Sequence, residues 1–368
     1  MTDSGRWSFS RPGDNLGAMP RLQPMIEPLC CALIFFCLAS YATWPLLSDL
    51  DSSLLFASRR FDGYGTIWLG EHFVHAWQGD VEIFHDSSVA WPFGLDLRLA
   101  DSFLFGLLYP PFRVFFEPVA AFNVFCLAAI TATGMGGWWL GSRVLGAGPI
   151  GGFAAGFVMA FNSLMHTYRI EGEAYLLAGL FLPLYAGALV RVATLHRIQD
   201  GFFAAAMLGA LAWSSGYYAI DGMLISLIMG GALAAGAWGG IRRELWRPML
   251  ALVLGSALLL GPLAWMVGQA LDGALAARFP EGQDPLSNIA LDSASLSGLL
   301  VPFGGTAHLR QGRIAYAGLA AIILGCAALV PGKRRDLTPW AALAAAGLVL
   351  SLGPYLRIDD TEVGSMPL

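Results

Sequence analysis

The sequence contains a single lysine, Lys333, and no run of more than three basic residues. Charged residues make up only 13% of its 368 residues, and acidic residues exceed basic ones by 26 to 21. Nucleic-acid binding depends on clustered cations that neutralise phosphates, so that class of function has no support here. The low charged fraction is also unlike that of a soluble domain, in which about 25% of residues are charged.

Cysteines are few, and all of them fall inside apolar segments: Cys30, Cys31, Cys37, Cys126 and Cys326. We interpret them as small buried hydrophobic residues and not as a disulfide framework. Hydrophobic residues make up 56% of the chain, and the mean hydropathy is +0.61. These values predict an all-α polytopic membrane protein.

A helix needs about 20 apolar residues to cross a bilayer, and the sequence predicts about nine such spans. The first, Pro28–Leu47, is too long for a signal-peptide core and lacks a small-x-small cleavage site, so we expect an uncleaved anchor. The others are Pro118–Leu140, Gly148–Leu164, Ala174–Val192, Gly201–Tyr218, Ile220–Gly239, Pro248–Gln269, Ile314–Val330 and Pro339–Tyr355.

The segment Ser102–Glu117 decides the topology, because it is apolar but only sixteen residues long. Pro110 and Pro111 interrupt its hydrogen bonding, and Arg113 follows them. An arginine at mid-bilayer costs about 2.5–3.5 kcal/mol on insertion scales. We therefore expect this segment to lie on the membrane surface.

Basic residues are enriched in cytoplasmic loops of membrane proteins. With the amino terminus inside, twelve basic and six acidic residues lie on the inner side. This predicts a multi-pass protein of the bacterial inner membrane with a cytoplasmic amino terminus. The expected parts are a tail (1–27), the first span (28–47), an extracytoplasmic loop with juxtamembrane helices (48–117), six spans (118–269), a second external loop (270–313), and the last two spans with a short tail (314–368).

The first external loop, Asp49–Asp101, holds nine carboxylates, three histidines and only three arginines. In this topology it faces the same side as His166–Glu173, Ser214–Asp221 and the 270–313 loop. Carboxylates beside a bilayer can bind a cation or accept a proton from a hydroxyl group. The outer surface is therefore where we expect the chemistry.

Within that loop, Asp62-Gly-Tyr-Gly-Thr66 predicts a turn that starts a helix running to about Gln78, with Asp62 or Thr66 as its cap. The spacing of Trp68, Glu71, His72 and His75 places them on one helical face. That face is either half of a metal site or a solvated amphipathic surface, and we favour the solvated surface.

This order of features resembles the GT-C superfamily of membrane glycosyltransferases, particularly bacterial proteins related to the dolichyl-phosphate-mannose-type mannosyltransferases. The resemblance rests on short motifs: Phe-Asp-Gly-Tyr-Gly-Thr-Ile-Trp68, Tyr-Pro-Pro-Phe112, Trp-Leu-Gly-Ser-Arg143, the polar turn His166–Glu173, the pair Tyr217-Tyr218, Leu-Val-Pro-Phe303 and Ala-Tyr-Ala-Gly318. In such proteins the first external loop carries a key aspartate, and Asp62 matches it.

The resemblance implies transfer of a sugar from a polyprenyl-phosphate donor lipid to an envelope glycan, lipid or protein at the outer face. Asp62 would be the base in an inverting displacement, and Arg169 would stabilise the leaving phosphate. Arg59 and Arg60 are further candidates for that phosphate contact. A divalent cation held by carboxylates is an alternative to arginine. The remaining candidates, for sugar or cation contacts, are His166, Glu171, Asp101, Tyr217 and Tyr218.

Two departures from the family pattern leave other interpretations open. The adjacent Asp-Glu pair of several such families is missing from the first loop, and the chain stops at Met366-Pro-Leu368, where relatives usually continue through further spans. A carboxy-terminally truncated transferase or a non-catalytic scaffold subunit is therefore an alternative. A transporter or flippase is another, although the predicted spans carry essentially no mid-membrane charge.

Overall fold

The computed structural model describes residues 23–55, 62–89, 91–92, 94–99, 103–162, 179–274, 339–347, 355–358 and 361–365. The predicted span Ile314–Val330 and nearly all of the 270–313 loop lie outside these residues. Within them the chain is mostly helical, with two short β-hairpins, β1–β2 and β3–β4. Four of the cysteines are described, and all four are free. Cys126 is buried as predicted, whereas Cys30 and Cys37 are exposed.

The long helices follow the predicted spans closely. They are α1 (Gln23–Ala42), α5 (Pro118–Trp139), α6 (Gly148–Ala160), α8 (Phe181–Leu195), α9 (Ile198–Ser214), α10 (Gly216–Ala234) and α11 (Trp246–Ala274). Three described stretches are long and apolar enough to cross a membrane: Pro118–Val144, Gly216–Ala234 and Arg243–Ala270. Shorter apolar helices are Ile26–Ala42, Gly148–Ala160 and Phe181–Leu195. The chain is therefore a helical membrane protein, whereas the count of nine spans stays a prediction.

Near the carboxy terminus, residues 339–347 are helical, and two strands follow, β3 (Tyr355–Ile358) and β4 (Thr361–Ser365). Tyr355, predicted to end the last span, begins β3 instead. Pro354 directly precedes that strand, and proline removes a backbone donor that a helix would need.

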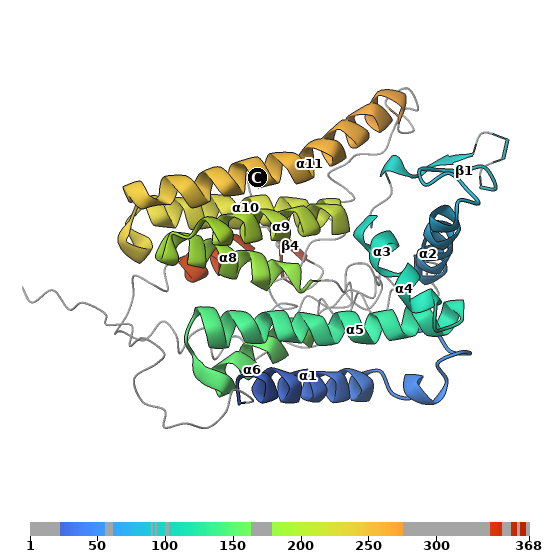
Figure 1. Cartoon of the computed structure of the whole chain (residues 1–368), viewed down its shortest axis with the longest axis horizontal. Coiled ribbons are helices and arrows are strands. Elements are labelled where there is room, and N and C mark those ends of the chain that lie inside the picture. The colour runs from blue at the N-terminus through green and yellow to red at the C-terminus, as the bar shows by residue number, and fades with distance from the viewer. Residues whose placement is uncertain are drawn as a thin grey trace, which may run out of the picture.

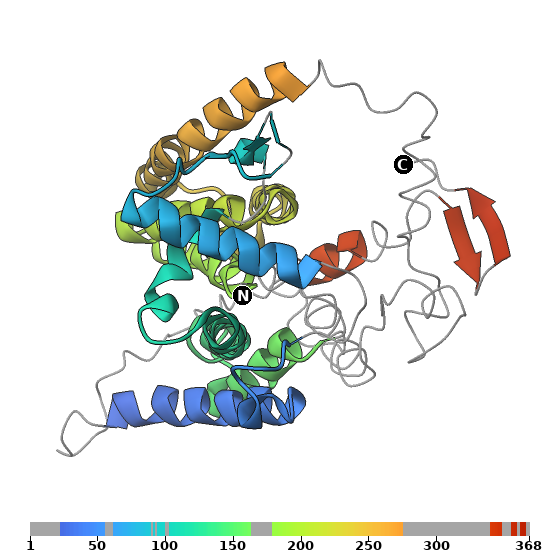
Figure 2. The same cartoon turned by 90° about the vertical axis from the view of Figure 1, so that its right-hand side faces the viewer.

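The long helices form two layers, one above the other in Figure 1. One layer contains α1, α5 and α6, and the other contains α8, α9, α10 and α11. Figure 2, in which α5 is seen end-on and α1 nearly lengthwise, shows α2 lying across one end of the bundle. The first loop therefore covers one end of the helix bundle.

From here on, the first loop means the chain between α1 and α5. It contains η1 (Leu46–Ser48), α2 (Asp62–Gln78), β1 (His85–Asp86), β2 (Leu95–Asp96), η2 (Leu97–Leu99), α3 (Phe103–Leu108) and α4 (Pro110–Arg113). The predicted helix from Asp62 to Gln78 is confirmed. The apolar segment after Ser102 forms two short helices separated at Tyr109, because Pro110 and Pro111 cannot continue the hydrogen bonding of α3. Six and four residues are too few to cross a bilayer.

Helices α5 and α6 pack with almost no space between their backbones. Gly137 lies against Gly156, and Gly141 lies against Gly152. Such small residues let membrane helices approach closely, which is how they gain packing energy where lipid offers no hydrophobic drive. A π-helical turn, η3 (Leu140–Val144), ends α5, and a short 3₁₀ turn on each side of Arg242 (η5, Ala237–Gly239; η6, Arg243–Leu245) connects α10 to α11.

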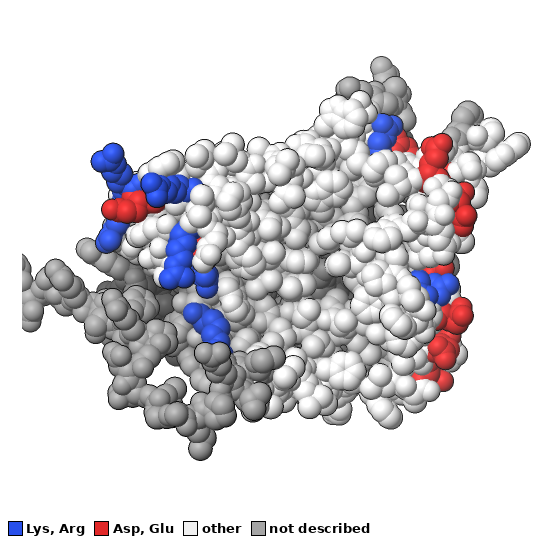
Figure 3. Space-filling view, viewed as in Figure 1, with Lys and Arg blue, Asp and Glu red and all other residues white. Residues whose placement is uncertain are grey.

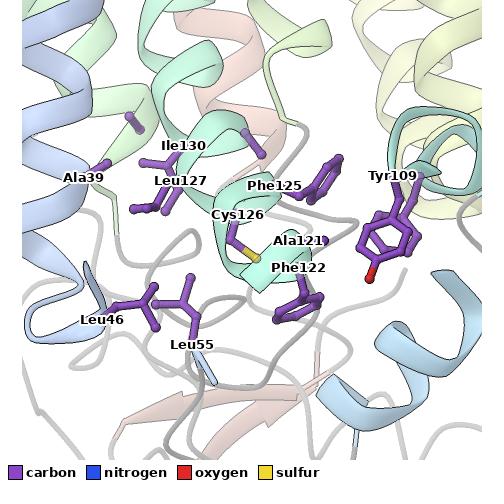
Figure 4. Close-up of a cluster of buried hydrophobic side chains, with 13 residues drawn as sticks. Ala39, Leu46, Leu55, Tyr109, Ala121, Phe122, Phe125, Cys126, Leu127 and Ile130 are labelled. Atoms are coloured by element: carbon purple, nitrogen blue, oxygen red, sulfur yellow. The ribbon is translucent and has the colours of Figure 1, made fainter. Parts of the chain in front are cut away.

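A buried apolar cluster joins the start of α5 to α1 and to the first loop (Figure 4). Phe122, Phe125 and Cys126 of α5 lie between Leu46 and Leu55 on one side and Tyr109 on the other. The first loop is therefore packed onto the membrane helices and does not simply extend from them.

The two ends of the bundle carry opposite charge (Figure 3). One, the basic end, carries Arg143, Arg191, Arg197, Arg242, Arg243 and Arg247 with the acidic residues Glu27, Asp200 and Glu244. The other, the acidic end, carries Arg98 and Arg113 with Asp49, Asp51, Glu71, Asp80, Glu82, Asp86, Asp96 and Glu117. The surface between them shows no charge in this view. This is the distribution expected of two aqueous faces separated by a bilayer.

Candidate active site at the acidic end

The acidic end is built around α2, which begins at Asp62, the residue predicted to be catalytic. One face of α2 packs on α3, through Phe73 and Leu69, with Leu97 of η2 beside them. Gly70 and Gly106 make this contact close: a Cβ atom on Gly70 would lie 2.8 Å from the ring of Tyr109, and one on Gly106 would collide with Phe73. The orientation of α2 is thus set by packing.

Glu71 joins α2 to Tyr109 and to α4 through two donors. The Arg113 guanidinium donates from Nε to Glu71 Oε1 at 2.7 Å, and the Tyr109 hydroxyl donates to the same oxygen at 2.9 Å. The Tyr109 hydroxyl also lies 3.1 Å from the carbonyl oxygen of Pro118, the first residue of α5. Burial raises the pKa of Tyr109, and the neighbouring Glu71 carboxylate raises it further. Tyr109 is therefore a neutral donor at any physiological pH.

His72 pairs with Asp86 and is buried, with 5% of its surface exposed. Its Nδ1 atom lies 3.3 Å from Asp86 Oδ2, while Ser88 donates to Asp86 Oδ1 from its hydroxyl (2.6 Å) and its backbone amide (2.8 Å). Burial alone would raise the pKa of Asp86, but these hydrogen bonds and the nearby imidazole outweigh it, so that its pKa lies below its usual value. The pair fixes the β1–β2 hairpin to α2.

The predicted solvated face of α2 is therefore wrong for three of its four residues. Trp68 is partly buried and packs against the cluster of Leu69, Phe73 and Leu97. Glu71 is paired with Arg113, and His72 is buried against Asp86. His75 alone has the expected exposure, with a 3.4 Å contact to Asp80 in which both side chains are more than half exposed. Helical spacing identifies neighbours on α2, but it does not indicate which neighbouring segment will cover them.

A second hairpin contact orders the turn before α3. Arg98 donates from Nε and Nη2 to the Asp96 carboxylate, at 3.0 and 2.6 Å. This pairing with Arg98 is the main cause that holds the pKa of Asp96 below its usual value. Gly94 has a φ of +76°, and a Cβ atom there would collide with His85, so only glycine fits.

Asn123, on α5, is fully buried, and all of its described hydrogen bonds go to the segment just before Asp62. Its Nδ2 donates to the carbonyl oxygens of Leu50 (2.8 Å) and Ser53 (2.6 Å), and its Oδ1 accepts from the backbone amide of Leu55 (3.2 Å). These bonds use both donors of the amide and hold residues 50–55 against α5. Asn123 is not among the site residues predicted from the sequence, although a lone amide within an apolar span is a recognisable signal.

Several predicted site residues lie outside the described part of the chain, so their positions stay predictions: Arg59, Arg60, Asp101, His166, Arg169 and Glu171. The pair Tyr217-Tyr218 is described, at the start of α10. Tyr217 is 67% exposed, whereas Tyr218 is 2% exposed and packs in a core cluster with Tyr185 and Leu211. The two rings therefore do not form one surface.

No group of three or more His, Cys, Asp or Glu side chains that could hold a metal ion occurs among the residues that the structure describes. The pairings above explain this, because Glu71, His72 and His75 each have a different partner. Asp101 and Glu171, the carboxylates proposed for a cation contact, lie outside the described residues.

No protein-family model and no curated protein sequence matches the chain. Among solved structures, it is similar to the archaeal oligosaccharyltransferase AglB from Archaeoglobus fulgidus, in complex with an inhibitory peptide and a dolichol-phosphate, with a TM-score of 0.59 and 16% sequence identity. The match covers 90% of this chain and 48% of AglB, so the chain spans about half the length of that protein.

This likeness defines the class of the fold. The chain is a helical membrane protein whose fold is similar to that of AglB. At 16% identity the similarity concerns the fold and not the chemistry.

Proposed function

We propose that this protein is an integral membrane glycosyltransferase that transfers a sugar from a polyprenyl-phosphate-linked donor to an acceptor at the acidic end of the bundle. The observation that carries the proposal is the GT-C-like fold, which extends over 90% of the chain. AglB was solved with a dolichol-phosphate bound, and a lipid of that kind is the donor carrier that we propose here. An envelope glycan, a lipid or a protein would be the acceptor.

The charge distribution supports an orientation for this reaction. Six arginines gather at the basic end, and by the positive-inside rule that end faces the cytoplasm. The ion pair between Arg143 and Glu27, at 3.1 Å, places the start of α1 at the same end. We therefore propose an inner-membrane protein whose amino terminus is cytoplasmic and whose first loop is outside.

Asp62 is the proposed general base. The acceptor hydroxyl loses a proton as its oxygen attacks the anomeric carbon, and a carboxylate within about 2.6–3.2 Å can take that proton. The sugar–phosphate bond breaks in the same displacement, and the anomeric configuration inverts. Negative charge that develops on the leaving phosphate requires cations, and Arg169 is proposed for this role, with Arg59 and Arg60 as alternatives.

The other predicted residues would contact the sugar or a cation: His166, Glu171, Asp101 and Tyr217. Tyr218 is a weaker candidate, because its ring is buried. If a divalent cation binds, it would neutralise phosphate charge, and Asp101 and Glu171 are the carboxylates proposed to hold it.

The test compares lipid-linked and envelope glycans in a deletion strain that carries wild type or Asp62→Asn at matched membrane abundance. We expect wild type to restore a missing glycan and Asp62→Asn to fail, since the amide cannot accept the proton. Restoration by both forms would contradict the catalytic role of Asp62 and favour a scaffold or a transporter.

A further inference from the structure

Two groups of hydrogen bonds flank Asp62 along the chain. One ends at Asn123 on α5, and the other ends at Tyr109 and Arg113, in the segment that packs on the start of α5. Asn123 holds the segment before Asp62, and Glu71 holds the helix that begins at Asp62. We propose that Asn123 and Glu71 are positioning residues that fix Asp62 relative to the membrane helices. This inference rests on the proposed function, in which Asp62 is the base.

The contact made by Asn123 is costly to break. With the 50–55 segment in place, both donors and the acceptor of the amide are satisfied in an apolar cluster that includes Phe122 and Cys126. Leaving a buried amide without partners costs about 1–3 kcal/mol in proteins. Partial displacement of the segment is therefore unfavourable, and Leu55, seven residues before Asp62, is held in one place.

The contact made by Glu71 fixes the rotation of α2 about its axis. Glu71 follows Asp62 by nine residues on one continuous helix, a rise of about 13 Å. Both side chains of the Glu71–Arg113 pair are less than one quarter exposed. A pair of this kind contributes little net stability relative to apolar residues of similar size. Its specific effect is to define one orientation of α2, the helix that begins at Asp62.

The arrangement matters because the proposed chemistry depends on distance. A misplacement of about 1 Å at a reacting group can lower a rate by about 100-fold. Loss of either anchor should therefore lower product formation between about tenfold and 100-fold, while the fold of the membrane helices is retained. A residue that merely stabilises the fold would change protein abundance and unfolding instead.

The physical test is hydrogen–deuterium exchange of the full chain in lipid nanodiscs. Asn123→Leu keeps the buried volume and removes the hydrogen bonds, and we expect exchange in residues 50–55 to rise at least about tenfold. Glu71→Ala should raise exchange in α2, whereas Glu71→Gln, which keeps an acceptor for Arg113 and Tyr109, should resemble wild type. Unchanged exchange in both Asn123→Leu and Glu71→Ala would overturn the anchoring.

Two matched controls separate anchoring from general perturbation. His75→Ala changes a residue of α2, the helix that carries Glu71, and removes only its exposed contact with Asp80. Thr131→Val removes a hydrogen bond from a hydroxyl to the carbonyl oxygen of Leu127 within α5 itself. Both should leave exchange in residues 50–55 and in α2 at wild-type levels, and an increase there in either control would overturn the assignment to these two anchors.

The functional test uses the glycan assay at matched membrane abundance. Asn123→Leu and Glu71→Ala should lose product toward the level of Asp62→Asn, and Glu71→Gln should restore it. If hydrogen exchange rises in Asn123→Leu and Glu71→Ala but both still form wild-type amounts of product, the positioning role is overturned and the proposed function stays intact. Loss of product in Glu71→Gln with wild-type exchange would also overturn it, because the charge would then act directly. If wild type itself restores no glycan, the proposed function and with it the role in catalysis fail, and exchange decides the anchoring alone.

Discussion

The close approach of α5 and α6 gives a quantitative prediction for Gly137→Ala. An added Cβ atom would lie 2.8 Å from Gly156 Cα, 2.9 Å from the carbonyl oxygen of Ala155 and 2.9 Å from Met159 Cγ. Carbon atoms in ordinary contact are about 3.5–4.0 Å apart, so the helices must separate by about 1 Å. Two of the three atoms belong to the backbone and cannot rotate away.

The expected destabilisation follows from two opposing terms. Overpacking of this kind costs about 1–3 kcal/mol, and a separation of about 1 Å also forfeits part of the dispersion energy along the contact. Alanine is better than glycine in a helix interior by about 1 kcal/mol. We therefore expect Gly137→Ala to lower the free energy of unfolding by about 1–2 kcal/mol.

The matched control is Gly230→Ala in α10, where an added Cβ atom would have no heavy atom within 4 Å. This change should be neutral or stabilising, by about 0.5–1 kcal/mol. The assay is unfolding in mixed micelles by added sodium dodecyl sulfate, followed by circular dichroism. Equal stability of Gly137→Ala and Gly230→Ala would refute the close packing of α5 on α6.

Three further predictions concern charge and backbone conformation. Because the pKa of Asp86 is lowered in the fold, its stabilisation is present above about pH 4 and is lost as pH falls through the folded value. As the pH is lowered below about 4, the melting temperature of wild type should fall more than that of Asp86→Asn. Parallel curves would contradict the hydrogen bonds of Ser88 and the pairing of His72 with the Asp86 carboxylate. Gly94→Ala should loosen the β1–β2 hairpin by about 1–3 kcal/mol, seen as faster hydrogen exchange in residues 85–96 with α5 unchanged. Arg191→Met leaves the buried Asp200 carboxylate without its cation, which lies at 2.7 Å, and should destabilise by about 3 kcal/mol in the same unfolding assay, whereas Arg191→Met combined with Asp200→Leu should recover most of that loss.

Local sequence features were sufficient to predict helices and helix breaks, because each of these depends on one stretch of chain. The apolar segments predicted the helices α1, α5, α6, α8, α9, α10 and α11, because backbone groups in lipid must bond within their own helix. The turn at Asp62 and the end at Gln78 predicted α2, and Pro110 with Pro111 predicted a break in the segment after Ser102. The count of spans depends on residues outside the described ones.

The acidic end shows where local features were not sufficient. Periodicity placed Trp68, Glu71, His72 and His75 together on α2, yet it could not indicate that Asp86 would bury one of them and Arg113 would pair with another. The pair Tyr217-Tyr218 was treated as one feature, but successive residues on a helix point about 100° apart, and only Tyr217 is exposed.

The sequence by itself determined that this is a helical membrane protein with an acidic first loop that starts a helix at Asp62. Those properties depend on hydrophobicity and on neighbours within a few residues. Only the tertiary structure decided that Asn123 holds Leu50 and that Glu71 binds Arg113, partners 73 and 42 residues apart. Hydrogen bonds between residues so far apart in the sequence form only when packing brings their two segments together, and no local sequence pattern predicts that packing.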